Sequence, residues 1–255
     1  MNLFLAAAIV AAPFAAPFAA EAVVQAPANV AAVLASPARS ADNVKLDTSR
    51  RPVQLLRFLG LRRGMHVLDM FGGNRYWVEI VAPAIGPQGK VVVWEPKQFY
   101  DDDSKKTFAA FAEKNRTVSI VSSPFEAPDL PKDYAEFVLI NLNYHDVYWE
   151  SAKYGIKRME PAAFLKALYA AVKPGGIVGV IDHSAKPGGD TRAVVEKLHR
   201  IDPAVVKADF QHAGFRLEGE SRLYANRADN RSLLVFDPKI QGKTDRFVFK
   251  FRKPR

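Results

Sequence analysis

The chain contains no cysteine, which excludes disulfide bonds, thiolate metal ligands and cysteine nucleophiles. Charge is missing from its first twenty residues, because the first charged side chain is that of Glu21. From Met1 to Ala20 every residue except Asn2 is apolar. The absence of cysteine does not identify a compartment, but this uncharged stretch is typical of a membrane-targeting segment.

The leader predicts export. Small residues near Ala20 and Ala22 suit cleavage by a signal peptidase, although the usual Lys or Arg before the apolar stretch is missing. We expect residues 1–25 to be a signal peptide or, alternatively, an uncleaved N-terminal anchor, with a disordered alanine-rich leader as the third interpretation. Pro13 and Pro17 disfavour a permanent membrane span. We therefore expect an exported protein, located in the periplasm.

Residues 26–49 are rich in Ala, Pro, Ser and Asn and have little periodicity, which predicts a linker or a loosely packed lead-in. One principal domain is expected over residues 50–255. It should begin with a covering helix, because Val53, Leu56 and Leu59 share one helical face.

After this helix, short β-branched runs alternate with segments of helical period. The predicted strands are 66–70, 90–96, 117–121, 135–142 and 176–183, and the predicted helices are 76–85, 104–114, 160–172 and 191–200. Residues 215–225, 231–236 and 246–254 then alternate apolar and polar side chains without an intervening helix. The expected fold is α/β: a Rossmann-like, mainly parallel sheet with helices on both faces and antiparallel strands at the C-terminal end.

The formal net charge of +9 indicates attraction to anions. From Arg246 to Arg255 basic residues alternate with phenylalanines, as in an ordinary strand with a solvated face. The alternative is contact with an anionic membrane or polysaccharide surface. We expect no nucleic-acid partner, because the protein is predicted to be exported.

A glycine turn is the strongest chemical signal. The strand that ends at Asp69 runs into Gly72 and Gly73 and then into a helix, a turn that lets the backbone approach a ligand. Glu95 ends the second predicted strand, where its carboxylate can accept hydrogen bonds from both hydroxyls of a ribose. Together they indicate a ribose-bearing cofactor. The alternative is an ordinary β-to-α turn and a solvated Glu95.

The segments "VLDM..GG", "VVVWEP" and "KPGGIVGVIDH", with the closing antiparallel strands, resemble class I S-adenosylmethionine-dependent methyltransferases over about residues 50–255. More narrowly, "NLNYHD" and "VIDH" resemble a group of exported bacterial predicted methyltransferases. The resemblance implies S-adenosyl-L-methionine as cofactor, with its methionine part on the glycine loop, its ribose at the acidic strand end and its adenine beside the segment 123–126. The implied cofactor-binding residues are Asp69, Gly72, Gly73, Glu95, Phe125 and Asn141.

The loop departs from the family pattern D-x-G-x-G-x-G. That pattern would place glycines at positions 71, 73 and 75, whereas this chain has Phe71, Gly73 and Arg75. Two side chains therefore stand where the cofactor would come closest to the backbone. We expect cofactor binding to be weakened, altered or lost.

The motif "NLNYHD" (141–146) follows the fourth predicted strand, on the acceptor side of the fold. It loosely resembles the Asn-Pro-Pro-Tyr motif of methyltransferases that act on amide or amine nitrogen. A histidine there can accept a proton near neutral pH, and a neighbouring carboxylate can orient it. The alternative is a turn capped by asparagines with a surface histidine. The candidate catalytic residues are Asn141, Tyr144, His145 and Asp146, with His183 as the second choice of base.

No metal site is expected. His145, His183, His199 and His212 lie on different elements, and no HxH or HExxH pairing occurs on one of them.

The leading interpretation is S-adenosylmethionine-dependent methyl transfer to a small-molecule acceptor. The alternative is a non-catalytic exported binding or structural protein that retains the fold, which the altered glycine loop and the cytoplasmic origin of the cofactor both favour. A nicotinamide-dependent oxidoreductase fits poorly, because the loop lacks G-x-G-x-x-G.

Overall fold

The computed structural model describes residues 25–255. The predicted signal peptide or anchor, residues 1–25, lies outside the described residues apart from Gln25. Across the described range, every helix is too short or too polar to span a bilayer.

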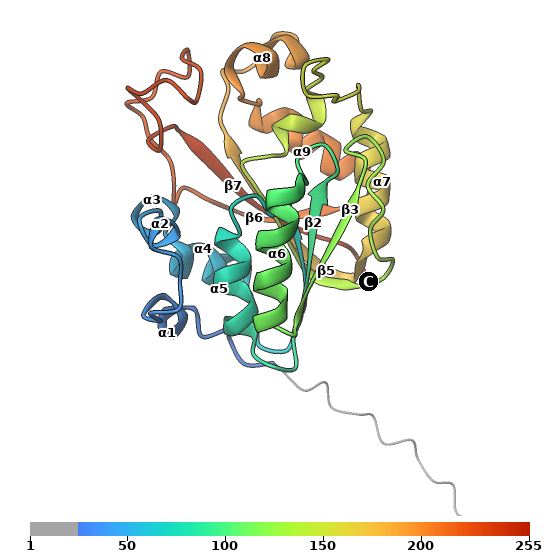
Figure 1. The fold of residues 1–255 in the computed structure, drawn as a ribbon. Coiled ribbons are helices and arrows are strands. Elements are labelled where there is room, and N and C mark those ends of the chain that lie inside the picture. Colours follow the sequence, from blue (N-terminus) through green and yellow to red (C-terminus); the bar gives the residue numbers. More distant parts are fainter. Residues whose placement is uncertain (1–24) are drawn as a thin grey trace, which may run out of the picture.

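A seven-stranded sheet forms the centre of the molecule, with the strand order β3-β2-β1-β4-β5-β7-β6 (Figure 1). β1 to β5 run parallel to one another, and β7 is antiparallel to both β5 and β6. The strands are β1 His66–Met70, β2 Lys90–Pro96, β3 Val118–Ser123, β4 Ala135–Asn141, β5 Val172–His183, β6 Arg216–Ser221 and β7 Arg246–Arg252.

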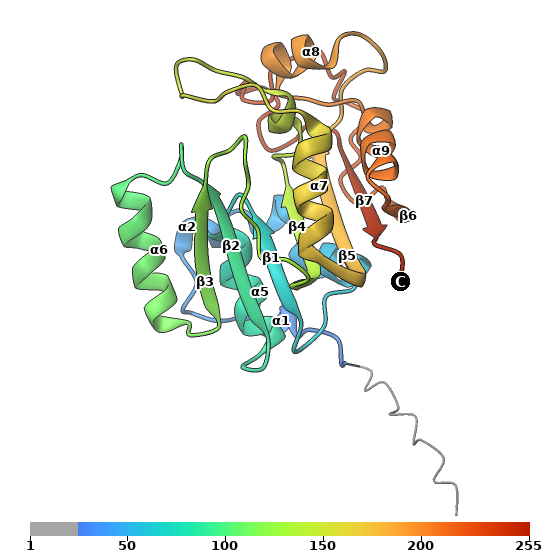
Figure 2. The ribbon, with the colours of Figure 1, turned by 90° about the vertical axis from the view of Figure 1, so that its right-hand side faces the viewer.

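Helices cover both faces of this sheet. In Figure 1 α4, α5 and α6 lie over the near face, and in Figure 2 α7 and α9 lie on the opposite side. The helices are α1 Val30–Leu34, α2 Ala41–Val44, α3 Asp47–Arg50, α4 Pro52–Leu59, α5 Tyr76–Ile85, α6 Asp102–Lys114, α7 Pro161–Ala171, α8 Thr191–Leu198 and α9 Pro203–His212, and a 3₁₀ helix, η1, spans His145–Tyr148.

Successive side chains along each strand point to opposite faces of the sheet, which gives two separate hydrophobic cores. Leu68 of β1 packs with α7 and α9 on one face, whereas Val67 packs with α4 and α5 on the other. Each fully buried aliphatic side chain contributes roughly 1.5–3 kcal/mol to folding. Gly179 of β5 admits α4, since a Cβ at this position would lie 2.5 Å from Leu59 Cδ1. The central strands β1, β2, β4 and β5 are therefore mostly buried, whereas the edge strands β3 and β6 remain partly exposed along their length.

These observations confirm the predicted fold class, a mainly parallel Rossmann-like sheet with antiparallel strands at its C-terminal end. The bounds predicted for the segments 66–70, 90–96 and 76–85 are those of β1, β2 and α5.

The predicted strand at 231–236 is wrong, because this segment consists of bends and turns. Val235 is buried and its N–H donates to the carbonyl of Leu198 at 3.2 Å, whereas Phe236 is 59% exposed. Val235 therefore anchors a loop onto the end of α8, and the segment pairs with no strand among the described residues.

The helix α9 was not predicted, although its start signal is present in the sequence. The Asp202 carboxylate accepts a hydrogen bond from the N–H of Ala204 at 2.8 Å, and Pro203 occupies the first helical position. Phe210 then packs fully buried against the sheet.

The segment 26–49, predicted to be a linker or loosely packed lead-in, contains α1, α2 and most of α3. Val30 is only 5% exposed, and the guanidinium of Arg39 donates to both carboxylate oxygens of Asp47, at 2.6 and 2.8 Å. The hydroxyl of Tyr76 on α5 donates to the same carboxylate at 2.7 Å. Composition did not reveal this packing, because its partners lie far away in the sequence.

Candidate functional site

Asp69 lies at the carboxyl end of β1 and is 3% exposed. Its Oδ2 is buried and has no hydrogen-bond partner among the described residues. Burial and the nearby Glu95 carboxylate raise the pKa of Asp69 to about 8, and the Arg50 guanidinium opposes this rise only in part. The site therefore presents a buried acid whose charged form the chain does not compensate.

Glu95 lies at the carboxyl end of the adjacent strand β2 and accepts a hydrogen bond from the N–H of Gly73 at 2.9 Å. Burial raises its pKa, although the N–H groups of Gly73 and Gly72 oppose the rise. A side chain at Gly72 would displace its neighbours, because a Cβ there would lie 2.2 Å from Val93 Cγ1. The glycine is needed for the loop to rest on β2 beside Glu95.

The backbone of this loop has positive φ at Phe71 (61°), Gly73 (49°) and Arg75 (63°). These are the three positions at which the family pattern has glycine. For a residue with a side chain this conformation costs about 1–2 kcal/mol. Phe71 and Arg75 thus adopt the left-handed backbone conformation that glycine adopts more easily.

Both departing side chains have contacts that hold them in place. The Phe71 ring lies 5.0 Å from the ring of Trp94 and 5.8 Å from that of Phe125, measured between centroids. The guanidinium of Arg75 donates to the carbonyl of Thr107 on α6 at 2.9 Å. Arg75 is therefore directed towards α6, whereas Phe71 is directed towards the segment expected beside adenine.

That segment is fixed against the end of β2. Phe125 is fully buried, and its N–H donates to Oε1 of Gln98 at 3.0 Å. Nε2 of Gln98 donates in turn to Glu126 at 2.9 Å. The fold therefore gathers Asp69, Gly72, Gly73, Glu95 and Phe125 at one end of β1, β2 and β3, while Asn141 ends the next strand, β4.

A second group of polar residues follows β4 and β5. His145, at the start of η1, is 4% exposed, and its Nδ1 lies 2.8 Å from Oδ1 of Asp182 at the end of β5. The backbone N–H of His145 donates to the other oxygen of this carboxylate at 2.8 Å. Burial alone lowers the pKa of His145, but the Asp182 and Asp146 carboxylates outweigh it and raise the pKa to about 9. The two carboxylates therefore favour the protonated form of His145 over the neutral form.

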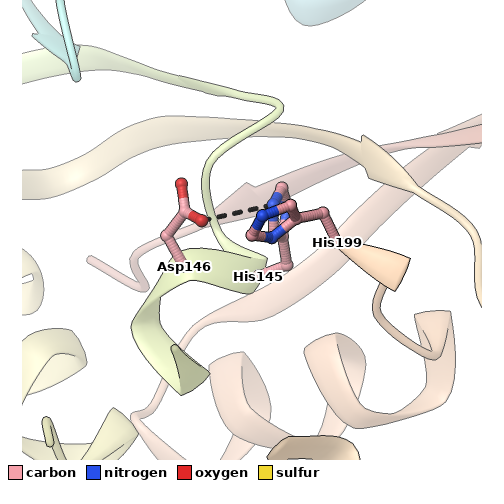
Figure 3. Close-up of side chains that lie close together, drawn as sticks. All are labelled: His145, Asp146 and His199. Carbon is pink, nitrogen blue, oxygen red and sulfur yellow. Dashed lines mark ion pairs between the residues drawn. The ribbon is translucent and has the colours of Figure 1, made fainter. Parts of the chain in front are cut away.

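Asp146 and His199 complete this group. Oδ1 of Asp146 lies 3.3 Å from Nε2 of His145, and Oδ2 accepts a hydrogen bond from Nδ2 of Asn143 at 3.2 Å. The ring of His199, which follows α8, has its centroid 5.5 Å from that of His145. Figure 3 shows the three side chains converging from η1 and from the end of α8.

Two candidate catalytic residues have other contacts. Tyr144 is fully buried, and its hydroxyl donates to Oδ2 of Asp209 on α9 at 2.8 Å. Nδ1 of His183 lies 2.7 Å from Oγ1 of Thr244. Burial lowers the pKa of His183 to about 3, with nearby cations adding to the effect and Asp182 opposing it, which makes this imidazole a weak base.

The structure therefore divides the predicted residues into a group at β1–β3 and a group at β4–β5. Sequence analysis did not foresee Arg50 beside Asp69 or the approach of His199 to His145. Nothing in the local sequence signals the electrostatic influence of Arg50 or the contact of the two histidines, because both depend on the tertiary fold.

No protein-family model and no curated protein matches the sequence. Among solved structures, a SAM-dependent methyltransferase from Aquifex aeolicus is 18% identical, with a TM-score of 0.56 over 84% of this chain and 100% of its own. An S-adenosylmethionine-dependent methyltransferase from Mesorhizobium loti is 16% identical, with a TM-score of 0.55 over 81% and 99% of the two chains. The [4+2]-cyclase SpnF is 14% identical, with a TM-score of 0.55 over 91% and 87%. The chain thus has the Rossmann-like fold found in S-adenosylmethionine-dependent methyltransferases.

Proposed function

We propose that this protein transfers a methyl group from S-adenosyl-L-methionine to a small-molecule acceptor. The observation that carries the proposal is the pair Asp69 and Glu95, two buried acids at the carboxyl ends of adjacent parallel strands. They lie beside a loop whose backbone has left-handed geometry at three alternate positions. In an open α/β sheet, the carboxyl ends of the strands are where ligands bind.

The residues present fit the cofactor. The unpartnered Oδ2 of Asp69 can accept a hydrogen bond from a cationic amino group, and Glu95 can accept from ribose hydroxyls. Phe125 is fully buried against Phe71 and Trp94, behind this end of the strands. When bound, S-adenosyl-L-methionine supplies a methyl group activated by its sulfonium.

The acceptor is proposed to lie at the end of β4, near Asn141 and His145. Methyl transfer depends mainly on alignment of the acceptor with the sulfonium, so this end of the site needs no strong base. His145 is buried at the start of η1 with its Nδ1 bonded to Asp182, so its proposed role is to form part of the acceptor side of the site.

The alternative, a non-catalytic binding or structural protein that retains the fold, is favoured by one specific contact. The ring of Phe71 packs towards Phe125, between the glycine loop and the segment proposed to hold adenine. Fold alone does not fix activity, and a cyclase is among the proteins that share this fold.

Export to the periplasm and contact with an anionic membrane or polysaccharide surface remain proposals that rest on the leader and the net charge of +9. The C-terminal basic residues are partly engaged within the protein. Arg252 donates to Glu218 at 2.9 Å, and Nζ of Lys253 donates to the carbonyl of Val172 at 2.7 Å.

Isothermal titration of the full chain with S-adenosylmethionine and S-adenosylhomocysteine tests the proposal. We expect micromolar binding by the parent, a loss of about a hundredfold or more in Glu95→Ala, and about tenfold tighter binding in Phe71→Gly, which corresponds to ~1.4 kcal/mol. Glu113→Ala, an exposed acid on α6, is the matched control and should bind as the parent does. If neither the parent nor Phe71→Gly binds at millimolar ligand, the non-catalytic alternative replaces this proposal.

A further inference from the structure

The side chains of His145, Asp146 and His199 each place one potential metal-ligand atom within 4.8 Å of the other two. The closest pair, Nε2 of His145 and Oδ1 of Asp146, is separated by 3.3 Å. Two ligand atoms bound to one tetrahedral ion at about 2.1 Å lie roughly 3.4 Å apart. The spacing of this pair is therefore that of two ligands of a common ion.

The ring of His145 is oriented so that Nε2 faces this group. Its Nδ1 is bonded to Asp182, a fully buried carboxylate that also accepts from the N–H groups of His145 and His183. A histidine that binds metal through one nitrogen typically has a carboxylate or carbonyl on the other nitrogen. Oδ2 of Asp146 is held in the same way by Asn143.

His199 is placed by aromatic neighbours and lacks a polar partner on one side. Its ring lies 5.3 Å from Trp149 and 5.2 Å from Phe236, measured between centroids. Within residues 25–255, its buried Nδ1 has no hydrogen-bond partner. A buried polar atom without a partner calls for an explanation, and an ion held by this histidine is one.

The charge of the group suits a cation. The carboxylates of Asp146 and Asp182 both face the imidazole of His145, at 3.3 and 2.8 Å. Two imidazoles and one carboxylate are a ligand set that suits Zn²⁺ and other divalent transition metals, and three protein ligands leave a fourth position for water or a substrate atom.

We propose that His145, Asp146 and His199 form a site for a divalent transition-metal ion, with Asp182 orienting His145. The site lies at the carboxyl ends of β4 and β5, in the half of the molecule where the acceptor is proposed to bind. Its existence does not depend on methyl transfer, and its test needs no cofactor. Sequence analysis expected no metal, because the two histidines lie on different elements; the tertiary fold brings them together.

The test is equilibrium dialysis of the untagged full chain against Zn²⁺, after removal of metal with a chelator and followed by elemental analysis. We expect one equivalent of zinc per chain, and a visible d–d spectrum when Co²⁺ replaces it. His199→Gln and Asp146→Asn should each weaken binding by tenfold or more. His212→Gln, which removes an exposed histidine outside the group, is the matched control and should bind as the parent does.

Several outcomes overturn the proposal. One is no zinc bound by the parent at about 100 µM, far above the dissociation constants of specific zinc sites. Another is zinc binding that His199→Gln and Asp146→Asn leave unchanged, or that His212→Gln abolishes. Circular dichroism of each variant establishes that it is folded, and His199→Gln, on a half-buried residue, is the variant least expected to disturb the core.

Discussion

Along the carboxyl ends of the parallel strands, buried carboxylates in the two halves of the site have pKa values shifted in opposite directions: Asp182 at β5 against Asp69 and Glu95 at β1 and β2. At β4–β5, Asp182 is fully buried, yet its pKa is lowered, because His145 and hydrogen-bond donors on His145 and His183 outweigh the effect of burial. At β1–β2, burial dominates and the pKa values of Asp69 and Glu95 are raised. The chain thus compensates the charge of Asp182 from within, whereas it leaves compensation of Asp69 and Glu95 to a ligand.

The largest loss of stability is expected when Asp182 is removed from the β4–β5 half. Asp182→Ala leaves the imidazole of His145 and two backbone N–H groups without their acceptor. Removing one partner of a buried charged pair destabilises a protein by about 3–5 kcal/mol. Urea unfolding measures this loss, with Asp103→Ala on the exposed face of α6 as control. A loss below about 1 kcal/mol would contradict the account of this network.

In the β1–β2 half, the raised pKa of Asp69 should make the free energy of unfolding depend on pH. The folded pKa of Asp69 is about 8, above the ordinary value of 3.8, so the folded state retains a proton that the unfolded state releases. The contribution of Asp69 to stability is therefore fully present below pH 4 and declines as pH rises towards 8. Between pH 5 and 7 the parent should lose about 1.4 kcal/mol per pH unit relative to Asp69→Asn. Urea unfolding of both proteins across this range gives the difference, and parallel curves would show that Asp69 is compensated after all.

A steric change in the same half should have a smaller effect. Gly72→Ala places a Cβ 2.2 Å from Val93 Cγ1 and 2.9 Å from Phe108 Cζ. Overpacking of this kind costs about 1–3 kcal/mol. The control is Gly219→Ala on β6, where the nearest atom to a new Cβ is Phe58 Cζ at 3.4 Å. Thermal unfolding should separate the two variants, and equal melting temperatures would contradict the packing argument.

The smallest effect is expected at Arg75. Arg75→Gly and Arg75→Ala both remove the hydrogen bond to Thr107, but only glycine relieves the backbone at φ 63°. The glycine variant should therefore be more stable than the alanine variant by about 1 kcal/mol. Denaturant unfolding measures this difference directly. If alanine were the more stable of the two, the left-handed geometry of the loop would not be the source of strain.

Much of the fold could be predicted because its strands and helices are signalled by residues within each segment. The apolar runs of β1 and β2 are buried on both faces, and α5 begins directly after the glycine turn, so their bounds follow from the residues themselves. The segment 231–236 also has the apolar content of a strand, but it forms a loop in which Val235 is buried and its N–H donates to Leu198 at the end of α8. The alternation of apolar and polar residues in 231–236 is also that of a half-buried strand, so periodicity alone could not identify this segment as a loop.

The two groups of the candidate site also differ in how far local sequence predicts them. Asp69, Gly72 and Glu95 could be selected from sequence, because each stands at the end of a predicted strand or in the turn after it. The convergence of His199 on His145 could not, since it requires α8 to return over η1.

The position of β7 inside the sheet has a consequence for how the chain folds. β6 is paired with β7, and β5 has β7 on its outer side, so both strands have unpaired backbone groups until Arg246–Arg252 has been added. Val248, Phe249 and Phe251 of β7 also contribute to both cores. During synthesis, a nascent chain that stops after β6 presents open strand edges and exposed apolar surface, and at that stage it depends on protection from aggregation.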